Sequence, residues 1–149
     1  MENKKGRIGY TTGVFDMFHI GHLQILKNAK KNCDYLIVGV SSDELVQNYK
    51  NKTPIIPFEH RAKIVSSIVY VDEVVVQRHR DKVKAFHDIG FNVMFVGDDW
   101  KGSELFEQLE KELDKFGACV EYFPYSKNIS STLFRKILQD IYNAENLTK

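Results

Sequence analysis

The sequence predicts an α/β domain in which a parallel sheet is covered by helices on both faces. Short apolar runs rich in β-branched residues alternate with stretches of helical periodicity along the 149-residue chain. Such runs are typical of parallel strands that are buried on both faces of a sheet. No repeat, low-complexity tract or linker divides the chain, so we expect one domain over residues 1–149.

Strands and helices are expected to alternate, with one additional helix in the middle of the chain. Short β-branched or aromatic runs predict strands at 8–11, 35–40, 73–76, 93–96 and 120–123. Apolar residues at helical spacing predict helices at 21–32, 43–49, 59–68, 81–89, 103–116 and 131–141. The segment 48–54 is polar and ends in Pro54, which excludes a continued helix, so a mobile loop is expected there, above the C-terminal ends of the strands. The polar tail 143–149 is expected to fray.

Composition excludes several classes of partner. The formal net charge is +1, which gives no overall attraction to nucleic acid or to an anionic membrane. The most obvious local basic clusters lie at 50–52 and 78–80, and any attraction to phosphate must come from such clusters. No apolar run approaches the roughly 20 residues that span a bilayer, and no signal-like stretch follows the charged N-terminus, so we expect a cytoplasmic protein without membrane insertion. Cys33 and Cys119 lie far apart in the sequence and are expected to be reduced thiols.

The most informative segment joins the first strand to the first helix and reads Thr-Gly-Val-Phe-Asp-Met-Phe-His-Ile-Gly-His over residues 12–22. Unpaired amides and the helix dipole favour an anionic ligand at such a turn. Histidines there can donate hydrogen bonds to charge that develops in a transition state. Either His19 or His22 alone is as readily structural, but the pair around Gly21 favours a functional site. Gly13 and Gly21 would let the backbone approach a phosphate closely.

This segment resembles the His-x-Gly-His signature of the nucleotidylyltransferase superfamily. Four further segments resemble cytidylyltransferases, particularly those acting on glycerol 3-phosphate: Pro-Phe-Glu-His-Arg at 57–61, Tyr-Val-Asp-Glu-Val at 70–74, Val-Gly-Asp-Asp-Trp at 96–100 and Ile-Ser-Ser-Thr at 129–132. The five segments follow the family's order at close to its spacing, so the resemblance covers nearly the whole chain. It implies a doubly wound, Rossmann-like domain with five parallel strands in the order 3-2-1-4-5, and a homodimer.

The resemblance also implies a reaction, in which CMP passes from CTP to a small phosphate monoester and pyrophosphate is released. Glycerol 3-phosphate is the default acceptor, giving CDP-glycerol for a cell-surface polymer, with Mg²⁺ held mainly by the CTP phosphates rather than by protein side chains. The acceptor oxygen is already an anion at neutral pH, so positioning and electrostatics should dominate over base catalysis.

Several alternatives to this reaction stay open. The acceptor could instead be another phospho-alcohol, phosphocholine, phosphoethanolamine or a sugar phosphate. The transferred group could be an adenylyl group from ATP. The chain could also be a nucleotide-binding module without activity, because a fold alone does not establish catalysis.

The resemblance assigns candidate roles residue by residue. The catalytic candidates are His19, His22 and Lys52. The nucleotide-binding candidates are Thr12, Gly13, Val14, Phe15, Gly21, Arg61, Ile129, Ser130, Ser131, Thr132 and Arg135. The acceptor-binding candidates are Asp16, Lys50, Lys82, Asp98, Asp99 and Trp100.

Each assignment has a structural alternative. Asp16 would repel phosphates and is also a common turn residue. Arg61 could grip a phosphate or form a salt bridge with Glu59 or Asp72. Loop lysines are usually solvated, and hydroxyls at the start of a helix usually cap it.

The chain departs from the family pattern at two positions where an arginine is expected. Val69 stands immediately before the Tyr-Val-Asp-Glu-Val segment, and residues 125–128 contain no arginine. Arg135, three residues beyond Thr132, or Lys127 would be the substitute. The spacing Ser-Ser-Thr-x-x-Arg is similar to that of adenylyltransferase branches, which leaves the acceptor and the details of CTP binding open.

Overall fold

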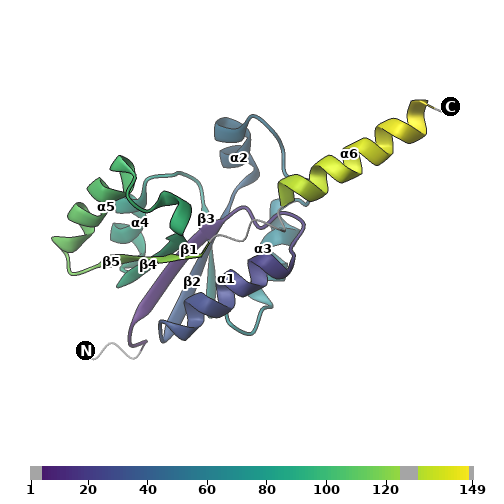
Figure 1. Ribbon diagram of the computed structural model, residues 1–149. Helices are drawn as coiled ribbons and strands as arrows, with labels where there is room; N and C mark the ends of the chain where they lie inside the picture. The colour runs from purple at the N-terminus through teal and green to yellow at the C-terminus, as the bar shows by residue number, and fades with distance from the viewer. Residues whose placement is uncertain (1–4, 125–130, 148–149) are drawn as a thin grey trace.

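The computed structural model describes residues 5–124 and 131–147. Within them, five parallel strands form one sheet in the order β3-β2-β1-β4-β5, as predicted (Figure 1). The strands are β1 (Ile8–Gly13), β2 (Tyr35–Ser41), β3 (Glu73–Gln77), β4 (Val93–Gly97) and β5 (Cys119–Phe123). All four pairings are parallel, and Ser41 at the end of β2 lies in register with Gln77 at the end of β3.

The helices follow the predicted pattern with two differences. They are α1 (Ile20–Lys31), α2 (Asp43–Lys50), α3 (Phe58–Ser66), α4 (Lys82–Ile89), α5 (Glu104–Asp114) and α6 (Ser131–Leu147). A 3₁₀ turn, η1 (Asp98–Trp100), directly follows β4 and was not predicted. The expected fraying from 143 is wrong as far as Leu147, because α6 continues there. Side-chain hydrogen bonds one turn apart, from Gln139 to Asn143 and from Asn146 to the Tyr142 carbonyl, support this last part of the helix.

Helices cover both faces of the sheet, which confirms the doubly wound fold (Figure 1). Because side chains alternate along a strand, β2 contributes Ile37 to one apolar cluster and Leu36 and Val38 to the other. The first cluster includes Phe106 from α5, whereas the second includes Leu26 from α1. The C-terminal ends of the strands meet at one edge, and the turn 12–22 lies there.

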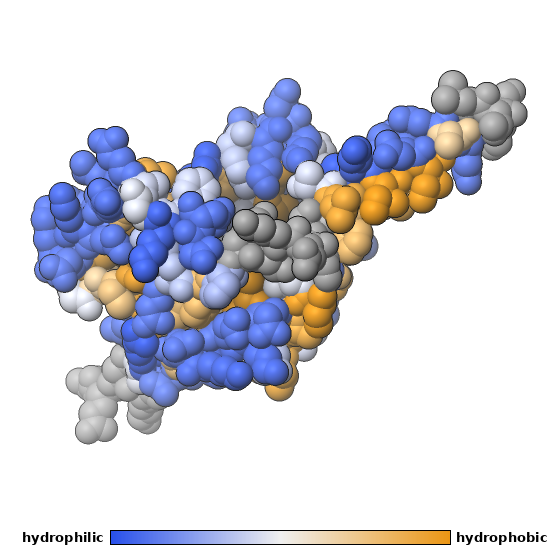
Figure 2. All heavy atoms as spheres, in the orientation of Figure 1, coloured by the Kyte–Doolittle hydropathy of each residue, from blue (hydrophilic) through white to orange (hydrophobic). Residues whose placement is uncertain are grey.

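Helix α6 extends away from the sheet and its covering helices (Figure 1). Its apolar side chains recur at helical spacing and are about half exposed, and Figure 2 shows them as an apolar stripe along one side of the helix. Among residues 5–124 and 131–147, no helix is long and apolar enough to cross a membrane.

Candidate active site

The turn between β1 and α1 has a strained backbone that its surroundings hold in place. Phe15 and Met17 lie in the left-handed region, with φ of 55° and 48°. This conformation costs of order 1 kcal/mol for a side chain of their size. Phe15 is nevertheless buried in the cluster beneath the turn. A Cβ added to Gly13 would lie 2.9 Å from the Phe15 ring, so Gly13 leaves the space that this packing needs.

Each of the two histidines of this turn accepts a hydrogen bond from a backbone amide through its Nδ1 atom. Nδ1 of His19 accepts a hydrogen bond from the Gly21 amide at 3.0 Å and thereby caps α1. Nδ1 of His22 accepts from the His19 amide at 3.2 Å, and the two rings stack with centroids 3.9 Å apart. Since an accepting Nδ1 carries no proton, the neutral ring carries it on Nε2. Both histidines therefore present an N–H donor at Nε2.

The surroundings keep these histidines neutral. The pKa of His22 is lowered to about 4, mainly by burial and also by His19, while Asp16 opposes the shift. Burial also lowers the pKa of His19. Nε2 of His19 is itself buried and has no hydrogen-bond partner among the described residues, so its N–H is available to a ligand.

Arg61 lies beneath the turn and, instead of pointing to a phosphate site as predicted, contacts other groups of the protein. Its side chain is fully buried, and its guanidinium donates to the carbonyls of Val14 at 2.6 Å and Ser41 at 2.9 Å. It also donates to the Ile56 carbonyl at 2.8 Å and forms a 2.6 Å ion pair with Asp43. The salt bridge is thus made with neither of the two expected acids, and these four partners engage Nε and both terminal nitrogens.

Asp16 also faces the protein rather than an acceptor. It is 4% exposed, and its two oxygens accept from the amides of Ile55 at 2.8 Å and Ile56 at 2.9 Å. Arg135 of α6 completes the arrangement with a 2.9 Å ion pair to Asp16 and a 3.2 Å hydrogen bond to the Thr53 carbonyl. Arg135, predicted to bind nucleotide, therefore joins α6 to the loop after α2 in this structure.

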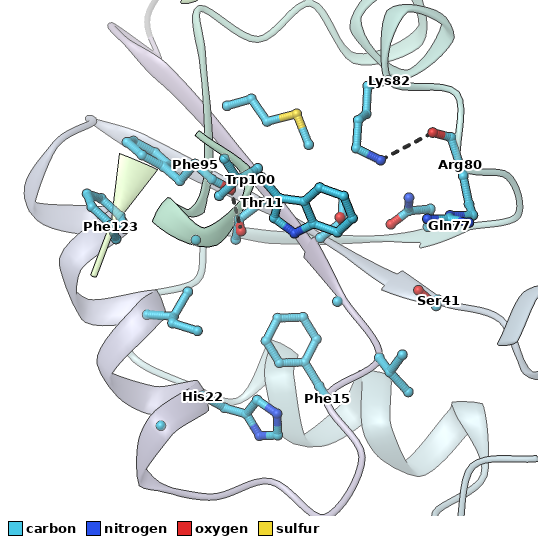
Figure 3. A pocket seen from close by; sticks show the side chains of 18 of the residues that line it. Thr11, Phe15, His22, Ser41, Gln77, Arg80, Lys82, Phe95, Trp100 and Phe123 are labelled. Carbon is cyan, nitrogen blue, oxygen red and sulfur yellow. Dashed lines mark hydrogen bonds between the residues drawn. The ribbon is translucent and has the colours of Figure 1, made fainter. Parts of the chain in front are cut away.

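A cavity of about 470 Å³ opens at the edge of the sheet where the strands end (Figure 3). It brings together ten of the predicted site residues: Thr12, Gly13, Val14, Phe15, His19, Gly21, His22, Lys50, Lys82 and Trp100. Lys52, Asp98, Asp99 and Thr132 do not line it. Ile129, Ser130 and Lys127 lie outside the described residues, as does the side chain of Ser131.

Three cations lie along one side of the cavity: Lys50, Arg80 and Lys82. Partial burial lowers the pKa of Lys50, and so do Lys52, Arg80 and Arg135. Burial and Arg80 lower the pKa of Lys82, which Asp81 partly offsets. The Lys82 ammonium donates to the Arg80 carbonyl at 3.2 Å (Figure 3). Cations held this close repel one another, and an anionic ligand would relieve the repulsion.

Sequence reasoning missed several residues that line this cavity. Arg80 lies in a basic cluster that is visible in the sequence, but no motif indicates which of its members faces the site. Ser41 and Gln77 also line the cavity, and the only feature of the sequence that could have indicated this is their position at the ends of two adjacent strands. The Arg80 guanidinium lies over the Tyr49 ring, with its Cζ 4.5 Å from the ring centroid, and no pattern predicted that contact.

Taken together, the fold and this edge of the sheet define a nucleotide-binding α/β domain with an anion site, and comparison with known proteins identifies its family. The model of the cytidylyltransferase-like family matches residues 10–137. The glycerol-3-phosphate cytidylyltransferase of Bacillus subtilis is 35% identical over 127 residues, which is 85% of this chain and 92% of that protein. The FAD synthase of Thermococcus kodakarensis is 36% identical over 147 residues, covering 95% and 96% of the two chains.

A solved structure agrees with these sequence matches. The lipopolysaccharide core biosynthesis protein of Thermoplasma volcanium superposes with a TM-score of 0.68 and 30% identity, over 83% of this chain and 99% of that one. The chain belongs to the cytidylyltransferase-like family. It is an enzyme of the nucleotidyltransferase class, to which both named relatives belong.

The first prediction concerns Arg61. The substitution Arg61→Lys removes the planar fork and leaves buried carbonyls without donors, so we expect a loss of about 3–5 kcal/mol in the free energy of unfolding. For a chain of this size that corresponds to a melting temperature lower by about 10 °C, measured without ligand by calorimetry. Arg78→Lys, at an exposed position, is the matched control and should not change the melting temperature. An unchanged melting temperature with weakened CTP binding would instead support the phosphate role.

The second prediction concerns the pH dependence that His22 confers. Its pKa in the folded chain is about 4, below its ordinary value of 6.5. Between these values the unfolded chain binds more protons, so the free energy of unfolding falls as the pH is lowered from 6.5 to 4, by up to about 1.4 kcal/mol per pH unit.

The variant His22→Asn keeps an acceptor for the His19 amide but does not titrate, so its stability should fall less steeply across this pH range. Denaturation curves at several pH values would measure the difference. Parallel curves for the two proteins would contradict the prediction.

Proposed function

We propose that this enzyme transfers CMP from CTP to a small phosphate monoester and releases pyrophosphate, with glycerol 3-phosphate as the default acceptor and CDP-glycerol, for a cell-surface polymer, as the product. The observation that carries the proposal is the pair of neutral histidines with Nε2 donors, lining one cavity with three cations. The glycerol-3-phosphate cytidylyltransferase from Bacillus subtilis supports this choice of acceptor. The proposed location is the cytoplasm.

In the proposed reaction an anionic oxygen of the acceptor phosphate attacks the α-phosphorus of CTP. A new P–O bond forms as the bond to the bridging oxygen of the β-phosphate breaks, and pyrophosphate leaves with that electron pair. No proton needs to be removed from the acceptor. His19 and His22 would donate through Nε2 to the oxygens on which charge accumulates, which stabilises the transition state more than the ground state.

The cations would act on the charges of the two substrates. Lys50, at the end of α2, and Lys82, at the start of α4, both line the cavity and would bring two anions together. Lys50 replaces Lys52 as the preferred catalytic lysine, because Lys52 does not line the cavity. Mg²⁺ would enter bound to the triphosphate and neutralise part of its charge. Asp16 would not hold the ion, because both of its oxygens already accept hydrogen bonds from backbone amides.

Adenylyl transfer to FMN is the second candidate function. A relative named FAD synthase matches nearly the full chain, and FAD is FMN joined to an adenylyl group. The cavity also has an aromatic wall, in which Trp100 and Phe106 pack with ring centroids 5.3 Å apart. Such a wall suits a planar ring system.

The third prediction separates these candidates. Pyrophosphate release should be measured with Mg²⁺, with CTP and ATP each tested against glycerol 3-phosphate, phosphocholine, phosphoethanolamine, sugar phosphates and FMN. We expect turnover with CTP and glycerol 3-phosphate, and a drop in kcat of about 100-fold or more in His19→Ala, since one oxyanion donor is lost.

Each other outcome of this assay has a defined meaning. Turnover with ATP and FMN alone would establish the second candidate. Binding of CTP without turnover across the panel would indicate a nucleotide-binding module. The exposed His60→Ala is the control for the histidine substitution and should keep its kcat.

We also propose a homodimer that buries the apolar stripe of α6. Five large hydrophobic side chains on this helix are exposed: Leu133 by 44%, Ile137 by 46%, Leu138 by 51%, Ile141 by 52% and Tyr142 by 63%. An apolar patch of this kind on a projecting helix is typical of an interaction surface.

The fourth prediction tests this assembly. Light scattering after gel filtration should give about twice the 17.3 kDa mass of one chain. The double variant Ile137→Glu, Ile141→Glu should shift that mass to a single chain, because it places charges in the buried stripe. Lys136→Glu, which changes an exposed polar position of the same helix, should remain dimeric. A monomeric wild-type protein would overturn the proposal.

A further inference from the structure

Gln77 occupies a fixed place at the edge of the sheet. It is the last residue of β3, is 9% exposed and lines the cavity. Its backbone carbonyl accepts from the Ser42 amide at 2.9 Å, and it pairs in register with Ser41 of β2. The side chain therefore starts from a backbone that two strands and the cap of α2 hold in position.

The orientation of the Gln77 amide follows from one contact. Nε2 donates to the His79 carbonyl at 3.1 Å. A carbonyl can only accept, so the NH₂ group must face His79, and Oε1 must point the other way. Oε1 is buried and has no hydrogen-bond partner among residues 5–124 and 131–147. A buried acceptor without a partner is rare in folded proteins and calls for a donor that the described part of the chain does not supply.

The surroundings of Gln77 define what that donor belongs to. Arg80 and Lys82 line the same cavity, and Figure 3 shows both on the side where Gln77 lies. These cations would attract the phosphate of the acceptor, whereas an amide oxygen repels phosphate oxygens and attracts an O–H or N–H group. A ligand that satisfies both carries a phosphate and a hydroxyl a few bonds apart.

We propose that Gln77 is a specificity-determining residue for the acceptor, and that its Oε1 accepts a hydrogen bond from a hydroxyl on the carbon chain of a phosphorylated polyol. This inference rests on the proposed function and narrows its acceptor class. Phosphocholine has no donor for Oε1, and the ammonium of phosphoethanolamine is repelled by Arg80 and Lys82. Glycerol 3-phosphate and the ribityl phosphate part of FMN both carry a phosphate and hydroxyl groups. The inference therefore holds whether the enzyme uses CTP with the first acceptor or ATP with the second.

The test compares polyol phosphates with alkyl phosphates of the same chain length. Glycerol 3-phosphate is paired with n-propyl phosphate, and ribitol 5-phosphate with n-pentyl phosphate, and binding of each is measured by titration calorimetry. We expect the wild-type protein to bind at least one polyol phosphate about tenfold or more tightly than its alkyl partner, because a site built for a hydroxyl rejects an analogue that lacks it.

The variant Gln77→Met keeps the size of the side chain and removes the acceptor. We expect it to bind the two members of each pair within about twofold, through weaker binding of the polyol phosphate and unchanged binding of the alkyl phosphate. Gln24→Met, at a position on α1 that does not line the cavity, should keep the wild-type preference. Melting temperatures of both variants show whether they fold.

Binding and turnover separate the two proposals. A polyol preference that Gln77→Met abolishes supports the inference even if no pyrophosphate is released, in which case the proposed reaction fails alone. Equal binding within both pairs by the wild-type protein, or a preference that survives in Gln77→Met, would overturn the inference even if CTP is turned over.

Discussion

The buried guanidinium of Arg61 is the interaction on which the rest of the site depends. Its four partners belong to the turn after β1, the end of β2, the first turn of α2 and the segment before α3. A group with several donors in a rigid plane can join these segments, whereas a flexible ammonium cannot hold so many acceptors in fixed directions. The strained turn above Arg61, the end of β2 and the first turn of α2 keep their relative positions because one side chain binds them all.

A division of electrostatic roles follows from that arrangement. Burial favours the uncharged form of both His19 and His22, and the proximity of His19 adds to this effect at His22, so they can lie against a triphosphate as donors of fixed direction. The positive charge comes instead from Lys50, Arg80 and Lys82 along the other side of the cavity. A chain with a net charge of only +1 thus gathers three cations around one cavity at the edge of the sheet.

The sequence was sufficient for the fold and for the histidine pair, because both are local patterns. Alternating strands and helices predicted the sheet, and the resemblance supplied its strand order. The contacts of Arg61 and Asp16 could not be predicted in this way. A charged residue in a motif indicates that its position matters, but tertiary placement decides whether it meets a ligand or a carbonyl. The separations between Arg61 and Val14, and between Asp16 and Arg135, are too long for any periodicity to predict.

The left-handed backbone at Phe15 and Met17 has a consequence for protein engineering. An eleven-residue copy of this turn, grafted between a strand and a helix of another scaffold, would carry both histidines but would relax to ordinary backbone angles. The graft would need the buried arginine below it, the two backbone amides that donate to the Asp16 carboxylate of the turn, and the pocket for the phenylalanine ring. The transferable unit is therefore this set of supports together with the turn, and only a scaffold that supplies all of them would aim the two Nε2 donors at one ligand.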